Sequence, residues 1–327
     1  MVFLFILSFP PVTVFSEENN PGDHHFAFSH QGSSRSYFVH VPSSYDPQIP
    51  VPVVIAFHGG GGNGKNMMAV SGLNATSDQH GFLVVYPEGT GRVRAGKLIG
   101  TWNAGRCCGA AMRNDVDDVG FIFELINRVI QGFHADPERI YLVGLSNGSQ
   151  MTFRAACELS ERIAAVSGVA SPGVFDGCDP QNAVPVIYFH SVEDPCAPYV
   201  GGTGGGCFQE YTNALLGLHQ KAQVWAVDSA AAYIGKWAAW NNVSGKPRVT
   251  YQGKDISCET WGDNAVTFCT MRDVGHAWPG GTHGPVCASK RSRSCRLYED
   301  VVGASNEDIP GNELMWKFFS THALRSR

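Results

Sequence analysis

Charged residues are scarce in this sequence, and neither sign dominates. The chain has 24 lysine and arginine residues and 29 aspartate and glutamate residues. Charged residues therefore make up 16% of the 327 residues, and the formal net charge is −5. Proteins that bind nucleic acid carry a basic patch or stripe. The one short basic cluster here, Lys290–Arg296, is typical of a solvated loop. The composition therefore predicts no nucleic-acid partner.

Two common ligand motifs are also missing. No cysteines stand in a Cys-x-x-Cys arrangement, which is a usual spacing in zinc sites. No Gly-Lys-Ser or Gly-Lys-Thr follows the glycine-rich segments, as a phosphate-binding loop would require. We therefore expect neither a metal nor another cofactor. No internal repeat is evident, and we expect a monomer.

Long apolar runs are absent after the first 15 residues. The run Val2–Phe15 has about the length of a signal-peptide core, and Pro10 and Pro11 interrupt it. A membrane-spanning helix needs roughly 20 apolar residues, so we expect no contact with a membrane. The run lacks a basic start and an Ala-x-Ala cleavage site, which suggests a truncated signal peptide. The sequence predicts a signal peptide over 1–16, a disordered segment over 17–25, one folded domain over 26–327, and secretion.

Ten cysteines, an even number, follow this export signal, and the combination favours disulfides. Their spacing predicts three pairs: Cys258 with Cys269 across a hairpin, Cys287 with Cys295, and Cys196 with Cys207. The other four cysteines leave alternatives open. Cys157 pairs with Cys178 beside a bond between the adjacent Cys107 and Cys108, or the four are cross-paired, or a thiol stays free.

The pentapeptide Gly144–Gly148, Gly-Leu-Ser-Asn-Gly, is the most informative feature that is present. An apolar, β-branched run over 139–143 precedes it, and a helical pattern over 149–157 follows it. Strand, Gly-x-Ser-x-Gly and helix make up the nucleophile elbow, in which a serine stands exposed at the end of a strand. The pattern predicts Ser146 as a nucleophile, against the alternative of a glycine-rich turn before a buried helix.

Two residues that could activate this serine follow later predicted strands. Asp194 comes after the apolar run 184–190, and His276 comes after the run 266–271. The order Ser, Asp, His is that of α/β-hydrolases. His276 would take the serine proton, and Asp194 would orient the imidazole ring and stabilise its cation.

Other side chains compete for these roles. Glu193 is the rival acid, but it precedes Asp194 by one residue and should point elsewhere. His58 and His190 end predicted strands and are interpreted as packing residues.

A run of four glycines follows the apolar strand 51–57. The segment His58–Gly62 reads His-Gly-Gly-Gly-Gly, the type of loop that forms an oxyanion hole in α/β-hydrolases. Glycines allow bare backbone N–H groups to approach a substrate closely. We expect the N–H of Asn147 and an N–H within Gly60 and Gly61 to bind the developing oxyanion.

Several segments carry a family resemblance. They are His58–Gly62, Tyr86–Gly89, Thr101–Gly105, Cys107–Gly109, Val116–Phe121, Gly144–Gly148, Ala156–Glu158 and Gly275–Gly280. Together they resemble the secreted polyhydroxybutyrate depolymerase / feruloyl esterase family of α/β-hydrolases, from about Ser36 to Phe319. The resemblance implies a catalytic α/β-hydrolase domain with an esterase triad of Ser146, Asp194 and His276.

The pattern of apolar runs agrees with that fold class. Strands are predicted over 36–41, 51–57, 82–86, 140–143, 164–169, 184–189 and 266–271, and helices over 66–80, 118–133, 149–158, 228–241 and 313–322. Such alternation predicts a mostly parallel, doubly wound sheet with helices on both faces. The site should lie at the carboxyl ends of the strands.

The expected substrate is a poly(3-hydroxyalkanoate)-type polyester or a feruloyl or acetyl ester of plant polysaccharide. Trp102 and Trp278 lie beside motif residues and are interpreted either as aromatic walls of the substrate site or as core. The glycine-rich segment 195–225 is expected to form a rim over the site, with Tyr199 as a third candidate substrate-binding residue. The alternatives are a serine peptidase of the same fold and a non-catalytic polysaccharide-binding protein.

Overall fold

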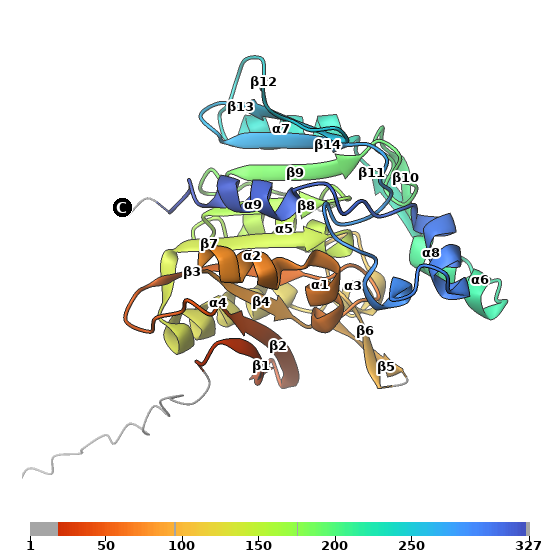
Figure 1. Ribbon diagram of the computed structural model, residues 1–327, viewed down its shortest axis with the longest axis horizontal. Helices are drawn as coiled ribbons and strands as arrows, with labels where there is room; N and C mark the ends of the chain where they lie inside the picture. The colour runs from red at the N-terminus through yellow and green to blue at the C-terminus, as the bar shows by residue number, and fades with distance from the viewer. Residues whose placement is uncertain (1–18, 95, 175, 325–327) are drawn as a thin grey trace, which may run out of the picture.

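A single twisted sheet organises the chain in the computed structural model, which describes residues 19–324 except 95 and 175 (Figure 1). Within that part, ten strands pair in the order β1-β2-β4-β3-β7-β8-β9-β14-β13-β12. The six central strands are parallel: β4 (Leu83–Pro87), β3 (Val51–Phe57), β7 (Ala135–Leu145), β8 (Ala165–Val169), β9 (Val186–Ser191) and β14 (Val266–Met271). Antiparallel strands flank them: β1 (Gly22–His30), β2 (Ser33–Val41), β12 (Arg248–Gln252) and β13 (Ile256–Trp261).

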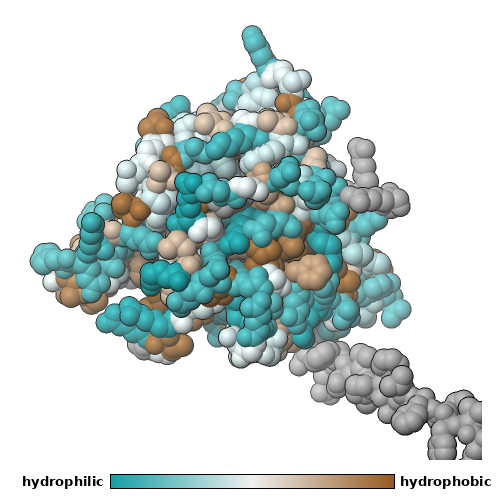
Figure 2. All heavy atoms as spheres, turned by 180° about the vertical axis from the view of Figure 1, so that it is seen from behind, coloured by the Kyte–Doolittle hydropathy of each residue, from teal (hydrophilic) through white to brown (hydrophobic). Residues whose placement is uncertain are grey.

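Helices cover both faces of the sheet. On one face pack α4 (Asp118–Phe133), α5 (Asn147–Glu158) and α7 (Ala230–Trp240). On the other pack α1 (Gly64–Ser71), α2 (Leu73–His80) and α9 (Gly311–Phe319). Figure 1 shows the second set in front of the sheet and the first set behind it. The outer surface seen from behind is mainly hydrophilic, with small separate hydrophobic patches (Figure 2). The predicted fold class is confirmed.

The side-chain alternation of β3 explains why both faces are covered. Val53, Ile55 and Phe57 point into the core under α4, α5 and α7, while Val54 and Ala56 point into the core under α1 and α2. All five side chains are essentially buried. A strand that is apolar on both faces must be covered on both, and this pattern is typical of parallel sheets.

The chain begins its fold earlier than predicted. Residues 22–25 belong to β1, which pairs with β2 over nine residue pairs, so that their assignment to a disordered segment is wrong. Exposed residues alternate with Phe26 and Phe28 in β1, and Phe28 packs against Phe121 of α4. The exposed half of that alternation is mainly polar and resembles a disordered sequence. The expected signal peptide over 1–16 lies outside the described residues.

The remaining differences involve short elements. The helix predicted over 66–80 is two helices, because Gly72 between them adopts the left-handed conformation with φ of 63°. Short elements that the sequence pattern did not reveal are β5 (Thr90–Arg94), β6 (Lys97–Thr101), α3 (Gly109–Arg113), β10 (Gly202–Gly205), α6 (Cys207–Leu216), β11 (Val224–Val227), η1 (Gly284–Cys287) and α8 (Arg293–Val302). Over the described residues, no helix is both long enough and apolar enough to cross a membrane.

Candidate active site

Ser146 stands on a strained turn at the carboxyl end of β7. Its backbone has φ of 57° and ψ of −120°, and the next residue begins α5. A Cβ atom added at Gly144 would lie 2.2 Å from the carbonyl oxygen of Gly148. A Cβ atom added at Gly148 would lie 2.2 Å from the carbonyl oxygen of Phe57. Only glycine fits at these two positions. The predicted strand-turn-helix geometry is therefore present, with a non-glycine residue at positive φ as in a nucleophile elbow.

Asp194 and His276 are brought together at the same edge of the sheet. Asp194 follows β9 and His276 follows β14, which is parallel to β9, so that both lie beyond the carboxyl ends of the strands. The Nδ1 atom of His276 lies 2.8 Å from Oδ2 of Asp194 and 3.0 Å from Oδ1. Glu193, the rival acid, is exposed and bonds to the hydroxyl of Ser191 instead.

The Asp194 carboxylate is buried and fully engaged. Besides His276, its Oδ1 accepts hydrogen bonds from the backbone N–H groups of Cys196 at 2.8 Å and Ala197 at 2.9 Å. Burial alone would raise the pKa of Asp194, but the nearby His276 and His190 outweigh burial and hold that pKa well below its usual range. Asp194 is therefore ionised at neutral pH and accepts a hydrogen bond from His276.

His190 and Tyr188 extend this network into the core, a role that the sequence reasoning missed. Nε2 of His190 lies 2.7 Å from the carbonyl oxygen of Ala197, to which it donates, and 3.5 Å from Oδ2 of Asp194. Its Nδ1 can then accept from the hydroxyl of Tyr188, at 2.6 Å. Both rings are completely buried. The available signal was the spacing: His190 and Tyr188 alternate on β9, and Asp194 is four residues further on.

The glycine loop after β3 lies against the turn at Ser146. A Cβ atom at Gly59 would lie 3.5 Å from that of Ser146, and one at Gly60 would lie 3.6 Å from that of Asn147. The N–H of Gly61, however, donates to the carbonyl oxygen of Gly100 at 2.8 Å. Gly61 as an oxyanion donor is therefore a wrong prediction, because its hydrogen is already used, and Gly60 remains the candidate.

His58 holds the start of this loop. Its Nδ1 donates to the carbonyl oxygen of Gly59 at 2.8 Å, and its Nε2 accepts from the N–H of Gly89 at 3.0 Å. Complete burial lowers the pKa of His58 to about 4, so that the ring is neutral at ordinary pH. The interpretation of His58 as a packing residue agrees with these contacts.

Trp102 and Trp278 are core residues, and their assignment as walls of the substrate site is wrong, because neither exposes any surface. Trp102 instead supports the site from behind. Its indole N–H donates to the carbonyl oxygen of His58 at 3.0 Å, and its backbone N–H donates to Oδ1 of Asn147 at 2.8 Å. The indole N–H of Trp278 donates to Asn312 at 2.8 Å.

Tyr199 is also not a substrate wall. Its hydroxyl lies 3.1 Å from that of Thr270, and its ring packs against Phe268 and against the buried ring of His190. It lines a pocket under α7 that contains none of the proposed triad. Tyr199 therefore supports His190, one layer of side chains behind Asp194.

The segment after Asp194 does reach the glycine loop. The ring of Phe208, on α6, lies close to Gly61: a Cβ atom added at Gly61 would be 2.8 Å from that ring. Phe208 itself is 47% exposed. Tyr211 of α6 packs edge-on against Tyr298 of α8. Figure 1 shows α6 and α8 beyond the arrowheads of the central strands. This arrangement agrees with the expected rim.

All ten cysteines are in disulfides. The three pairs predicted from spacing are confirmed, and the open alternatives resolve as Cys157 with Cys178 and Cys107 with Cys108. The Cys196–Cys207 bond joins the loop after Asp194 to the first residue of α6, and Cys258–Cys269 joins β13 to β14. Disulfides therefore brace the segments that carry Asp194 and His276.

The parallel sheet, the strained serine after β7 and the Asp194–His276 pair define an α/β-hydrolase. Residues 35–200, about half of the chain, match the family model described as Esterase PHB depolymerase, and the chain belongs to that family.

Curated relatives and solved structures extend this comparison. The chain is 27% identical to feruloyl esterase B of Piromyces equi over 265 residues, which cover 76% of this chain but 44% of that protein. It is 28% identical to the putative esterase NocK of Nocardia uniformis subsp. tsuyamanensis over 262 residues, 77% of this chain and 72% of that one. The fold resembles that of an acetyl xylan esterase from Aspergillus awamori, with a TM-score of 0.53 and 17% identity over 78% of this chain and 94% of the other.

Proposed function

We propose that this protein is a secreted serine carboxylesterase that hydrolyses feruloyl or acetyl esters of plant polysaccharide. The observation that carries the proposal is the Asp194–His276 pair, 2.8 Å apart, at the same sheet edge as the strained Ser146. Ser146 is the nucleophile, His276 the general base and Asp194 the residue that orients the imidazole. A serine hydroxyl is a poor nucleophile until a base takes its proton.

In the first half of the reaction, the Ser146 oxygen attacks the ester carbonyl carbon while Nε2 of His276 takes the serine proton. The Nδ1–H of His276 donates to Asp194, which leaves Nε2 as the free acceptor. The tetrahedral intermediate then collapses, the bond to the alcohol oxygen breaks, and His276 returns its proton to that oxygen. The products are a free alcohol and an acyl group on Ser146.

The developing oxyanion is bound by the N–H groups of Asn147 and Gly60. Asn147 is the first residue of α5, and the first N–H groups of a helix have no acceptor within the helix. Trp102 fixes the position of Asn147, because each backbone group of Trp102 bonds to the Asn147 side chain. The positive end of α5 favours a negative charge at this point.

In the second half, water attacks the acyl carbonyl carbon and His276 takes a proton from the water. The bond to the Ser146 oxygen breaks, and the proton moves from His276 to that oxygen. The carboxylic acid leaves, and the enzyme returns to its starting state.

The substrate class and the compartment rest on separate observations. The curated relatives include a feruloyl esterase and a bifunctional acetylxylan esterase/xylanase, XynS20E of Neocallimastix patriciarum. The family name also includes depolymerases of polyhydroxybutyrate, an ester polymer. Five disulfides favour an oxidising compartment, which for an enzyme that acts on plant polymers is the extracellular space.

A panel of four substrates tests this function: acetylated xylan, methyl ferulate, poly(3-hydroxybutyrate) and a peptide anilide. We expect turnover of the first two, and its loss in the Ser146→Ala variant. Hydrolysis of poly(3-hydroxybutyrate) alone would show that the protein is a polyester depolymerase and does not act on esters of plant polysaccharide. Turnover of the anilide alone would contradict the esterase assignment.

A further inference from the structure

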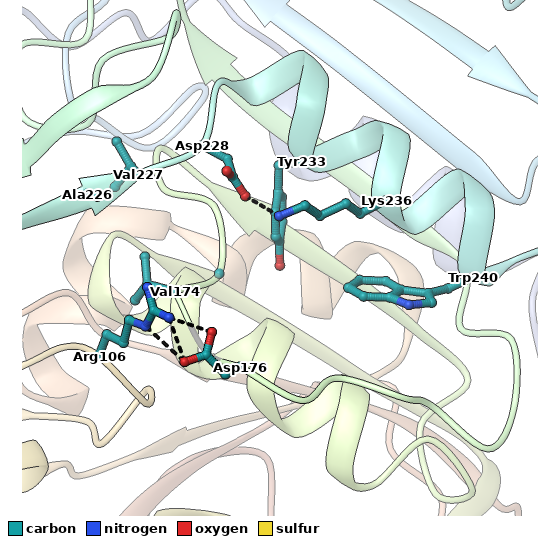
Figure 3. A pocket seen from close by; sticks show the side chains of 10 residues that line it. Arg106, Val174, Asp176, Ala226, Val227, Asp228, Tyr233, Lys236 and Trp240 are labelled. Carbon is teal, nitrogen blue, oxygen red and sulfur yellow. Dashed lines mark hydrogen bonds and ion pairs between the residues drawn. The ribbon is translucent and has the colours of Figure 1, made fainter.

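A polar pocket lies between α7 and the loop that follows β8, separate from the candidate active site. Its volume is about 210 Å³. Figure 3 shows its side chains: the Arg106–Asp176 pair on one side, the Asp228–Lys236 pair on another, Trp240 at one end and Tyr233 in the middle. We call it the Tyr233 pocket. None of Ser146, Asp194 and His276 lines it.

Two layers of side chains lie between the Tyr233 pocket and the turn at Ser146. Val174 and Val227 line the pocket and form a buried cluster with Cys107 and Cys108. The sulfur of Cys107 lies 3.8 Å from Nδ2 of Asn147, which adjoins Ser146. The pocket therefore lies on the far side of the Cys107–Cys108 disulfide from Asn147.

The charges of the Tyr233 pocket balance. Arg106 bonds to both carboxylate oxygens of Asp176, each at 2.6 Å, and Lys236 lies 2.5 Å from Asp228. Such exposed pairs add little to stability, typically less than about 1 kcal/mol. With two cations and two anions the pocket has no preference for a charged ligand, but it offers donors and acceptors side by side. Neighbouring hydroxyl groups, which both donate and accept, match that arrangement.

Tyr233 and Trp240 supply the other features of a ligand site. Tyr233 is 3% exposed, and its hydroxyl makes no hydrogen bond of good geometry within the described residues, although the Trp237 side chain and the Gly173 backbone lie within reach of it. Its hydroxyl end points into the space between the two ion pairs (Figure 3). Buried polar groups are normally paired, so a missing partner suggests a ligand group. The half-buried indole of Trp240 offers an apolar surface at one end.

We propose that the Tyr233 pocket binds one neutral sugar residue of the polysaccharide that carries the ester. An uncharged ring with several hydroxyl groups suits balanced charges, an unpaired hydroxyl and an aromatic surface, and the volume is below the roughly 300–1,000 Å³ of a drug-sized ligand site. An aromatic acyl group fits less well, because four charged side chains line the pocket. This inference rests on the proposed function, in which that sugar belongs to the leaving alcohol.

The first test measures a specificity ratio: kcat/KM for a feruloylated xylo-oligosaccharide divided by kcat/KM for methyl ferulate. We expect Trp240→Ala and Arg106→Ala each to lower this ratio about tenfold, which corresponds to about 1.4 kcal/mol. The matched controls are Trp261→Ala, which alters the other pocket under α7, and Arg128→Ala, which removes the exposed pair with Glu124. An unchanged ratio in both pocket variants, or an equal fall in the controls, would overturn the proposal.

The second test needs no ester chemistry. Unesterified xylo-oligosaccharide is titrated by NMR or calorimetry into the Ser146→Ala protein, with and without Arg106→Ala. Binding that Arg106→Ala weakens about tenfold would support the subsite, even if the panel showed no esterase activity. Undetectable binding at millimolar oligosaccharide, with full esterase activity, would overturn the subsite and leave the proposed function standing.

Discussion

The ring of His190 lies 3.5 Å from the carboxylate of Asp194, and both side chains are completely buried. On its other side, His190 is held by Tyr188 at 2.6 Å. The carboxylate is thus positioned from behind, while its front accepts from His276. Since a small displacement of a catalytic group can cost up to about 10²-fold in rate, this contact bears directly on the proposed chemistry.

Loss of the support behind Asp194 should lower kcat and leave KM nearly unchanged. We expect His190→Gln to reduce kcat by about 10- to 100-fold, because Asp194 then holds His276 less well. Tyr188→Phe, which removes only the hydroxyl, should have a smaller effect in the same direction. Steady-state kinetics on methyl ferulate measure both. A rise in KM at constant kcat would mean that His190 acts on substrate binding instead.

The choice between two adjacent acids can be tested directly. Asp194→Asn should lower kcat by about 10⁴, since the amide cannot hold His276 in the required tautomer. Glu193→Gln is the matched control, because Glu193 is exposed and bonds only to Ser191 among the contacts described. We expect near-normal kcat for that variant on p-nitrophenyl acetate. The reverse order of effects would show that the acid was misassigned.

The sequence predicted the residues whose signal is local and missed those whose role depends on neighbours. Ser146 sits in a pattern that only glycines at 144 and 148 permit, and the buried strands have continuous apolar runs. The networks of His190 and Trp102, in contrast, depend on partners brought together by the fold. The glycine run 59–62 was correctly predicted to lie beside Ser146, but the N–H of Gly61 donates to Gly100. Gly100 belongs to β6, a strand that was not predicted. β1 was missed because half of its side chains are polar.

Burial of His58 should make stability fall in acid. Its pKa is lowered from 6.5 to about 4, so the unfolded chain binds a proton that the folded protein does not. The contribution of His58 is fully present above pH 6.5 and is lost as the pH falls toward 4. Between pH 7.5 and pH 5 the loss is about 2 kcal/mol. Buried His283 and half-buried His322, whose pKa values are also lowered by desolvation, act in the same direction.

Urea unfolding at pH 7.5, 6 and 5 measures this slope. The His58→Gln variant keeps an amide donor and acceptor, and its free energy of unfolding should fall less steeply with pH than that of the wild type. The comparison uses slopes, because the substitution itself also lowers stability. Identical slopes would contradict a buried, neutral His58.

The oxyanion hole can be located with a bound phosphonate. We expect its oxygen to lie about 2.7–3.1 Å from the N–H nitrogens of Asn147 and Gly60. The N–H of Gly61 should keep its bond to Gly100. A crystal structure in which the oxygen faces solvent, or in which Gly61 has left Gly100 to bind it, would contradict the assignment.

In the proposed reaction Ser146 carries the acyl group, and covalent labelling can identify this residue. The protein is treated with a fluorophosphonate, which reacts with activated serines, and the intact mass and the modified peptide are determined by mass spectrometry. We expect one label per chain, located on Ser146, with loss of esterase activity in proportion, and no label in Ser146→Ala or after denaturation. Retained esterase activity in Ser146→Ala, or a label on another residue that abolishes activity, would contradict it.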